Sequence, residues 1–339
     1  MVHALPTSGD AQSPTLFDEP RPWIPTSLAL NTNGKRLMAE AAGEHSPCSS
    51  SPDWTVRGPE GREGRQAFLV RLVKPTEAAT CRLLEWSACV AKSSPDIECW
   101  ISVDNSFPMS RETRSRLRRL AQGGWLRHTY NEERMIQAFP ELERMFKVPE
   151  VKVELVKDKQ LGRQRSLAWG FHTEALCLWW EDVGRCFSNV WVFEDDVGYT
   201  GDISTLLEDF RSAPEDLVAF LLKTPLPPSW HWYDASSRRF KRRFPVGSKK
   251  RRKIREHVVR ISFRLMEKLD ECSRRGEIAW SECSIPSICL DEPGMTCFDL
   301  HPYVKKYNWN SRVTEREWEA LCEHGTPSKK HKLYHALKF

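Results

Sequence analysis

Short apolar runs alternate with amphipathic stretches over most of the chain. The runs 66–73 and 97–103 predict buried strands. The stretch between them opens with Pro75-Thr76-Glu77 and predicts a helix that has Thr76 as its N-cap. A strand, a helix and a second strand in this order favour a parallel pair joined by a right-handed crossover.

The same alternation returns further along. Residues 166–181 predict a helix, 189–193 a strand, 202–210 a helix and 217–222 a strand, and a further helix is expected to begin near Glu256. This alternation predicts an α/β fold, with a mainly parallel sheet that has helices on both faces.

The N-terminal stretch differs from the rest. Residues 1–64 are rich in Ser, Pro, Thr and Gly, as in the segment 46–52, and carry few periodic apolar positions. Such a segment buries too little apolar surface to offset its ordering entropy. We therefore expect a disordered tail over 1–64, followed by one ordered domain over 65–339.

Composition narrows the class of protein only slightly. Hydrophobic residues make up 40% and charged residues 29%, as in ordinary globular proteins, and the net charge is +5. Much of that excess comes from one basic run, 238–255, so the charge alone does not indicate a nucleic-acid partner. We expect a soluble protein, since the chain shows neither a signal peptide nor the roughly 18 consecutive apolar residues of a transmembrane segment.

The cysteines leave the compartment open. There are eleven, an odd number, with no C-x-x-C pair and no zinc-finger spacing. A reducing compartment is the simplest interpretation, and a few disulfides in a secretory lumen are the alternative.

Carboxylates follow two of the predicted strands. Asp104 ends the second strand, and Glu194-Asp195-Asp196 ends the strand 189–193. Open α/β sheets bind ligands beyond the carboxyl ends of their strands. Three consecutive carboxylates repel one another unless a cation neutralises them, and Mg²⁺ or Mn²⁺ would bridge them to a substrate phosphate. The alternative is that these acids cap the next helix or face water.

The stretch 189–202 resembles the metal-binding strand end of GT-A glycosyltransferases, and more narrowly that of glycosyltransferase-like proteins of algae and other protists. The resemblance extends more weakly from about Gln66 to Phe339. It implies a GT-A-like (Rossmann-like) fold, a nucleotide-sugar donor, Mn²⁺ (or Mg²⁺), and a hydroxyl acceptor on a glycan or a protein. It also suggests work in the secretory pathway, in the Golgi.

The resemblance assigns roles residue by residue. Glu194 and Asp196 fill the outer places of the D-x-D motif, with Asp195 between them and Glu where Asp is usual. Asp196 is then the principal metal ligand, and Glu194 lies near the ribose and the metal. Asp104 resembles the acid that meets the nucleotide, and His335 the late histidine that completes the metal shell. A surface histidine in a basic tail is the alternative for His335.

Further candidates are Glu282, Arg163 and Arg165. The segment 279–286 resembles the late acidic element of inverting enzymes, which makes Glu282 a candidate general base. The alternative is that Ser281 and Glu282 only start a short helix. Arg163 and Arg165 precede the predicted helix 166–181 and are candidates for contact with a diphosphate.

The basic run 238–255 has three interpretations: a solvated loop, a nuclear-localisation or RNA-binding patch, and a loop that closes over a diphosphate or an acidic acceptor. RNA is disfavoured because no RNA-recognition, KH or zinc-knuckle pattern accompanies the run. Trp230 and Trp232, which precede it, either stack on sugar rings or belong to the core.

Three functions therefore compete. The leading one is a metal-dependent glycosyltransferase. A sugar-nucleotidyltransferase is disfavoured, because Lys74-Pro75-Thr76-Glu77 stands where a Gly-rich basic loop is expected. The third is a non-catalytic GT-A-like protein whose basic loop contacts a polyanion, either nucleic acid or an acidic glycan.

Overall fold

The computed structural model describes residues 29–30, 36–37, 64–149, 151–152, 166–221, 225–307, 313–324 and 331–337. The chain forms two compact units, Met1–Ser50 and Ser51–Phe339. In the first unit, β1 (Ala29–Leu30) pairs antiparallel with β2 (Arg36–Leu37). Apart from these strands and Gly64, the predicted tail lies outside the described residues.

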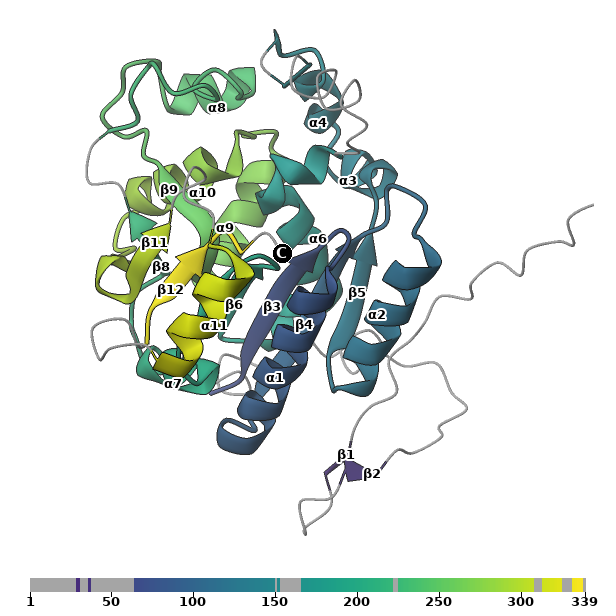
Figure 1. Ribbon diagram of the computed structural model, residues 1–339. Helices are drawn as coiled ribbons and strands as arrows, with labels where there is room; N and C mark the ends of the chain where they lie inside the picture. The colour runs from purple at the N-terminus through teal and green to yellow at the C-terminus, as the bar shows by residue number, and fades with distance from the viewer. Residues whose placement is uncertain are drawn as a thin grey trace, which may run out of the picture. The chain divides into compact units, whose positions relative to one another are not determined.

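The second unit is built on a seven-stranded sheet with the order β10-β8-β9-β6-β3-β4-β5 (Figure 1). Among its strands as described, only β9 runs antiparallel to its neighbours, β6 and β8. The predicted mainly parallel sheet is therefore confirmed. The bounds of the strands are β3 Gln66–Leu72, β4 Ile97–Asp104, β5 Leu126–Tyr130, β6 Asn189–Glu194, β8 Leu217–Leu221, β9 Ile254–Ser262 and β10 Cys297–Asp299.

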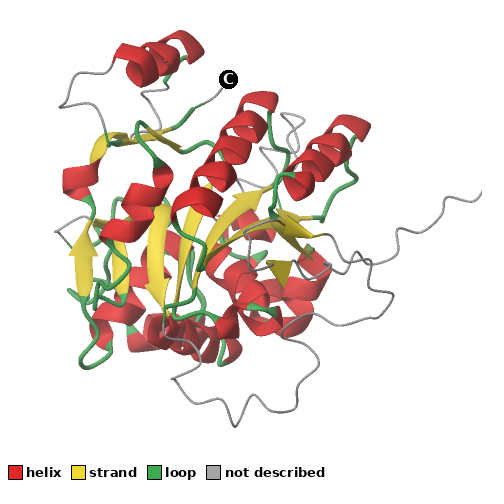
Figure 2. Cartoon of the chain, turned by 90° about the horizontal axis from the view of Figure 1, so that it is seen from below, coloured by secondary structure: helices red, strands yellow, loops and turns green. Residues whose placement is uncertain are grey.

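Helices cover both faces of this sheet, as predicted (Figure 2). On one face α1 contacts α2 and α7, and on the other α6, α9 and α10 contact one another. Their bounds are α1 Glu77–Ser93, α2 Arg111–Gln122, α7 Ile203–Asp209, α6 His172–Asp182, α9 Phe263–Arg274 and α10 Ser281–Asp291. Shorter helices are α3 Glu132–Ala138, α4 Glu141–Met145, α8 Arg238–Arg243, α11 Glu315–His324 and the 3₁₀ turns η3 Leu167–Trp169, η4 Gly184–Cys186 and η5 His301–Tyr303.

Local chemistry explains the element boundaries. Thr76 caps α1 by accepting from the amide of Ala79, as predicted, and Asp202 caps α7 through the amide of Ser204. The core beneath α1 is aromatic, and the ring of Phe68 lies 5.1 Å from that of Phe193 in an edge-on arrangement. Because β3 pairs parallel with both β4 and β6, the carboxyl ends of these three strands lie at one edge of the sheet.

Two predicted helices are wrong in detail. Glu256 lies within strand β9, and the next helix, α9, begins at Phe263. The charged residues of β9 hide its strand pattern, because they are buried in ion pairs and hydrogen bonds instead of facing water. The predicted helix 166–181 is two elements, η3 and α6, because the backbone at Phe171 is not helical. Gly170, just before it, lies against the ring of Trp280, where a side chain would clash.

The basic run is not a single loop. Ser237 caps the short helix α8, which carries the first part of the run, and the last part enters β9. Nine cysteines among the described residues are free. No helix within the described ranges is long and apolar enough to cross a membrane.

Candidate metal centre

Strand β6 carries Glu194 to the carboxyl edge of the sheet. β3 pairs parallel with both β6 and β4, so Glu194 and Asp104 end their strands at the same edge. Asp104 is buried, and its carboxylate accepts from the amide of Ser106 at 2.9 Å and from the hydroxyl of Ser166. The Asp104 side chain thus also holds the loop that follows β4.

A second, smaller sheet brings His335 to this edge. It has the order β11-β12-β7, with bounds Val304–Tyr307, Leu333–His335 and Gly198–Tyr199. β7 begins directly after the acidic triplet and pairs antiparallel with β12, so that Tyr334 lies opposite Gly198. The amide of Leu337 then donates to the carbonyl of Asp196 at 2.8 Å. This register is what places His335 beside the triplet.

A third residue, His257, comes from β9. Ala219 of β8 pairs with Val259, whereas the next residue, Phe220, pairs with Arg255. Residues 256–258 therefore have no partner in β8 and form a bulge relative to that strand. Such a bulge redirects side chains. Sequence reasoning missed His257 because the stretch was interpreted as a helix; the β-branched residues Val258, Val259 and Ile261 that follow it were the available signal for a strand.

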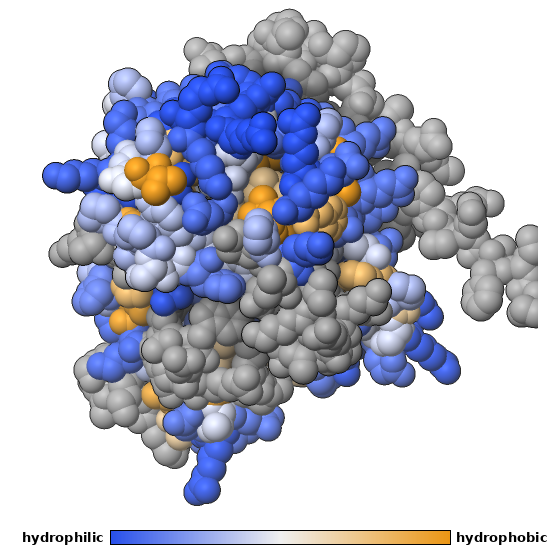
Figure 3. All heavy atoms as spheres, turned by 90° about the horizontal axis from the view of Figure 1, so that it is seen from above, coloured by the Kyte–Doolittle hydropathy of each residue, from blue (hydrophilic) through white to orange (hydrophobic). Residues whose placement is uncertain are grey.

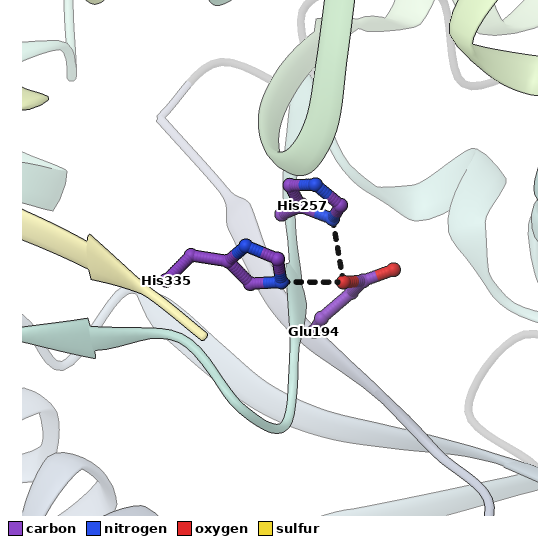
Figure 4. A group of neighbouring side chains, drawn as sticks. All are labelled: Glu194, His257 and His335. Atoms are coloured by element: carbon purple, nitrogen blue, oxygen red, sulfur yellow. Dashed lines mark hydrogen bonds and ion pairs between the residues drawn. The ribbon is translucent and has the colours of Figure 1, made fainter. Parts of the chain in front are cut away.

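The three side chains converge, as Figure 4 shows. Nδ1 of His257 lies 2.6 Å and Nε2 of His335 lies 3.5 Å from Oε2 of Glu194. One nitrogen or oxygen from each residue lies within 4.8 Å of the others. The two imidazole rings stack at a centroid distance of 3.7 Å and an interplanar angle of 12°. Two nitrogens and a carboxylate oxygen thus point at one small volume.

Charge at this point is strongly organised. Nη2 of Arg71 donates to Oε1 of Glu194 at 3.0 Å, which leaves Oε2 to the histidines. Burial alone raises the pKa of Glu194, but His257, His335 and Arg71 hold it well below its ordinary value. Burial lowers the pKa of His335, but Asp196 and Glu194 outweigh it and raise that pKa to about 9. Glu194 is therefore an ionised carboxylate.

The other two acids of the triplet differ in their roles. Oδ1 of Asp196 lies 3.4 Å from Nε2 of His335, so the predicted partners do meet. Asp195 offers its carbonyl oxygen to Nη2 of Arg82, a buried residue of α1. The structure thus brings together Glu194, Asp196 and His335 and adds His257.

Glu282 lies at the start of α10 and is buried. Its carboxylate lies 3.4 Å from Nζ of Lys253 and 3.8 Å from Nη1 of Arg255. Burial, helped by Glu256, raises its pKa, although nearby cations oppose the shift. The hydroxyl of Ser281 accepts from the amide of Thr173, so this pair does more than start a helix.

The remaining candidates are only partly placed. Arg163 and Arg165 lie outside the described residues. Trp232 stacks on Trp280 at 3.7 Å between ring centroids, which favours a packing role. The ring of Trp230 lies 4.6 Å from Nζ of Lys253.

Part of the basic run is held within the structure. Arg243 pairs with Glu277, Asp291 and Glu292 at 2.9, 2.9 and 2.5 Å. Arg251 is fully buried and donates to backbone carbonyls. The face that carries α8 is still mostly hydrophilic (Figure 3). These pairs leave the polyanion-binding alternative without support.

No family model matches the chain, and no curated protein is significantly similar to it. Similar solved structures include mouse xyloside xylosyltransferase 1 in its apo form, with 10% identity, a TM-score of 0.38, and coverage of 80% of this chain and 97% of that chain. An active-site mutant of LgtC has 13% identity, a TM-score of 0.38 and coverage of 80% and 88%.

Core-mannan synthase A of Aspergillus fumigatus, in its Mn/GDP form, has 11% identity, a TM-score of 0.36 and coverage of 66% and 68%. By name, the xylosyltransferase and the mannan synthase are glycosyltransferases, the class that the stretch 189–202 resembles. At such TM-scores the likeness supports no inference, so the fold and site stand on the strand order and distances given above.

Proposed function

We propose that this protein is a metal-dependent glycosyltransferase that moves a sugar from a nucleotide-sugar donor to a hydroxyl acceptor on a glycan or protein. The observation that carries the proposal is the convergence of Glu194, His257 and His335 at the carboxyl edge of a mainly parallel sheet. That edge is where α/β folds bind nucleotides and phosphates.

The donor atoms suit a divalent ion. An ionised carboxylate oxygen and two imidazole nitrogens within 4.8 Å of one another can share one ion, with open positions for substrate oxygens. Two imidazoles favour Mn²⁺ over Mg²⁺, which prefers oxygen ligands and water. A bound ion would neutralise the charge that develops on the departing diphosphate.

Other residues would orient the metal ligands and bind the nucleotide and the diphosphate. Arg71 orients Glu194 through its other oxygen, and Asp196 stands close enough to His335 to share the ion or orient the ring. Asp104, at the same edge, together with Asp195, Arg163 and Arg165, is proposed for the nucleotide and diphosphate.

Glu282 is proposed as the general base, because burial raises its affinity for the proton of the acceptor hydroxyl. Lys253 and Arg255 beside it suit an acidic acceptor.

Thermal stability tests this proposal. The full chain is melted with UDP or GDP, in the presence of Mn²⁺ or EDTA. A ligand that binds only the folded state raises the melting temperature, and we expect this rise only when nucleotide and Mn²⁺ are both present. A nucleotide effect that is identical in EDTA, or none with any nucleotide, would contradict the proposal.

A further inference from the structure

A second cavity lies between α1 and α11, outside the metal centre. It has a volume of about 430 Å³, within the range of small-ligand sites. The lining residues of each helix are spaced three, four and seven positions apart, so a single face of each helix lines the cavity. The turn after β7 closes the third side, and Figure 1 shows α11 beside α1.

The charged residues of the cavity are of two kinds. Glu85, Glu315 and Glu319 are exposed at its walls. Arg82 is buried, and its Nη2 is committed to the carbonyl of Asp195. Its Nε has no hydrogen-bond acceptor among the residues that the structure describes. The cavity thus combines carboxylates, which only accept hydrogen bonds, with a guanidinium, which only donates them.

Aromatic rings complete the lining. Trp86 and Tyr199 are buried and contribute to the inner wall, whereas Trp318 of α11 is partly exposed. Trp318 is held in place against Gly198, where a Cβ would lie 2.5 Å from its ring. A fixed, partly exposed indole offers a flat apolar surface at little cost in side-chain entropy.

These features restrict the chemistry of the ligand. Three glutamates repel an anion, and a simple cation cannot accept from Arg82. A hydroxyl both donates and accepts, so a polyhydroxyl compound can satisfy both kinds of group at once. The C–H faces of a sugar ring also suit an indole. We propose that this cavity is a binding site for a neutral carbohydrate, separate from the metal centre.

The proposal does not depend on the proposed function, and its test keeps the two apart. Saturation-transfer-difference NMR is recorded on the full chain in EDTA, with lactose, maltose and methyl α-mannoside as neutral probes. Choline and glucuronate serve as cationic and anionic probes. We expect a signal from at least one neutral sugar that depends on the cavity residues, and no such cavity-dependent signal from choline or glucuronate. Because no metal is needed, failure of the metal centre leaves this result unchanged.

Variants locate the binding. Trp318→Ala removes the indole, and Glu319→Gln is a mild change at an exposed position; each should weaken sugar binding by about tenfold or more. Glu323→Gln, on the same helix but outside the cavity lining, should bind like the wild type. Absence of binding by every neutral probe, binding of choline or glucuronate that both cavity variants weaken, or wild-type affinity for sugar in both cavity variants would overturn the proposal.

Discussion

Nε2 of His335 lies 3.4 Å from Oδ1 of Asp196, although most of the C-terminal half of the chain separates the two residues. The pairing of β12 with β7 produces this contact, because β7 follows the acidic triplet directly. The metal centre therefore depends on a short antiparallel pair outside the main sheet. Changes that shift β12 should alter metal binding more than they alter the core of the sheet.

Gly198→Ala tests this dependence. A Cβ at Gly198 would lie 2.5 Å from the side chains of Leu337 and Trp318, so these side chains, which pack over the β7–β12 pair, have to shift. We expect a loss of about 1–3 kcal/mol in the free energy of unfolding, as for other overpacked sites. We also expect weaker Mn²⁺ binding, because the displaced Leu337 is only two residues from His335. Denaturant melts and calorimetry measure the two effects.

Gly123→Ala is the matched control. Its Cβ would meet the end of the Leu84 side chain, between α1 and the end of α2 and away from β12. This variant should lose stability without any change in affinity for Mn²⁺. Equal losses of metal affinity in both variants would show that β12 has no special role.

Glu282→Gln separates acceptor activation from donor binding. The amide keeps the shape of the side chain but cannot take a proton. We expect the transfer rate to fall by about 10²–10⁴-fold, while the nucleotide still raises the melting temperature in the presence of Mn²⁺. Asp291→Asn, at the other end of α10 where the acid pairs with Arg243, should leave the transfer rate nearly unchanged. An undiminished rate in Glu282→Gln would rule out this residue as the base.

Glu174 should make stability depend on pH. It is fully buried in α6, and burial, partly opposed by a hydrogen bond from Ser273, raises its pKa to about 8 from the ordinary 4.5. Between these values the folded state keeps a proton that the unfolded state has lost, so stability falls as the pH rises. The slope for one proton is about 1.4 kcal/mol per pH unit.

Glu174→Gln removes this titration. The difference in unfolding free energy between the variant and the wild type should grow in favour of Gln from about pH 5 to about pH 8. Urea melts at several pH values measure it. A constant difference across the range would mean that Glu174 is ionised in the folded state.

Hydrophobic pattern was sufficient to predict the strands β3, β4, β6 and β8 of the main sheet and the helices α1, α6 and α7. The runs at β3, β4 and β6 and the cap at Thr76 are local features, and each stands where it was expected. β9 was missed because its polar residues are neutralised by partners distant in sequence: Glu256 pairs with His172 and His257 with Glu194. No local pattern shows that such a charge will be buried.

The residues of the candidate metal centre were also predicted only in part. The acidic triplet and His335 were found because the stretch 189–202 and the C-terminal segment carry a resemblance. His257 was not, because its place in the site follows from the register break between β8 and β9, which is a tertiary feature. The cavity between α1 and α11 could not be predicted from the sequence either, because it forms only where these two distant helices lie together.

Direct titration of Mn²⁺ into the full chain tests the central claim most directly. By isothermal calorimetry we predict one ion per wild-type chain, with weaker binding of Mg²⁺. Glu194→Gln and His257→Ala should each reduce the Mn²⁺ affinity by about tenfold or more, whereas His301→Ala, at an exposed histidine of η5, should bind like the wild type. Absence of Mn²⁺ binding, or wild-type affinity in both Glu194→Gln and His257→Ala, would contradict the account.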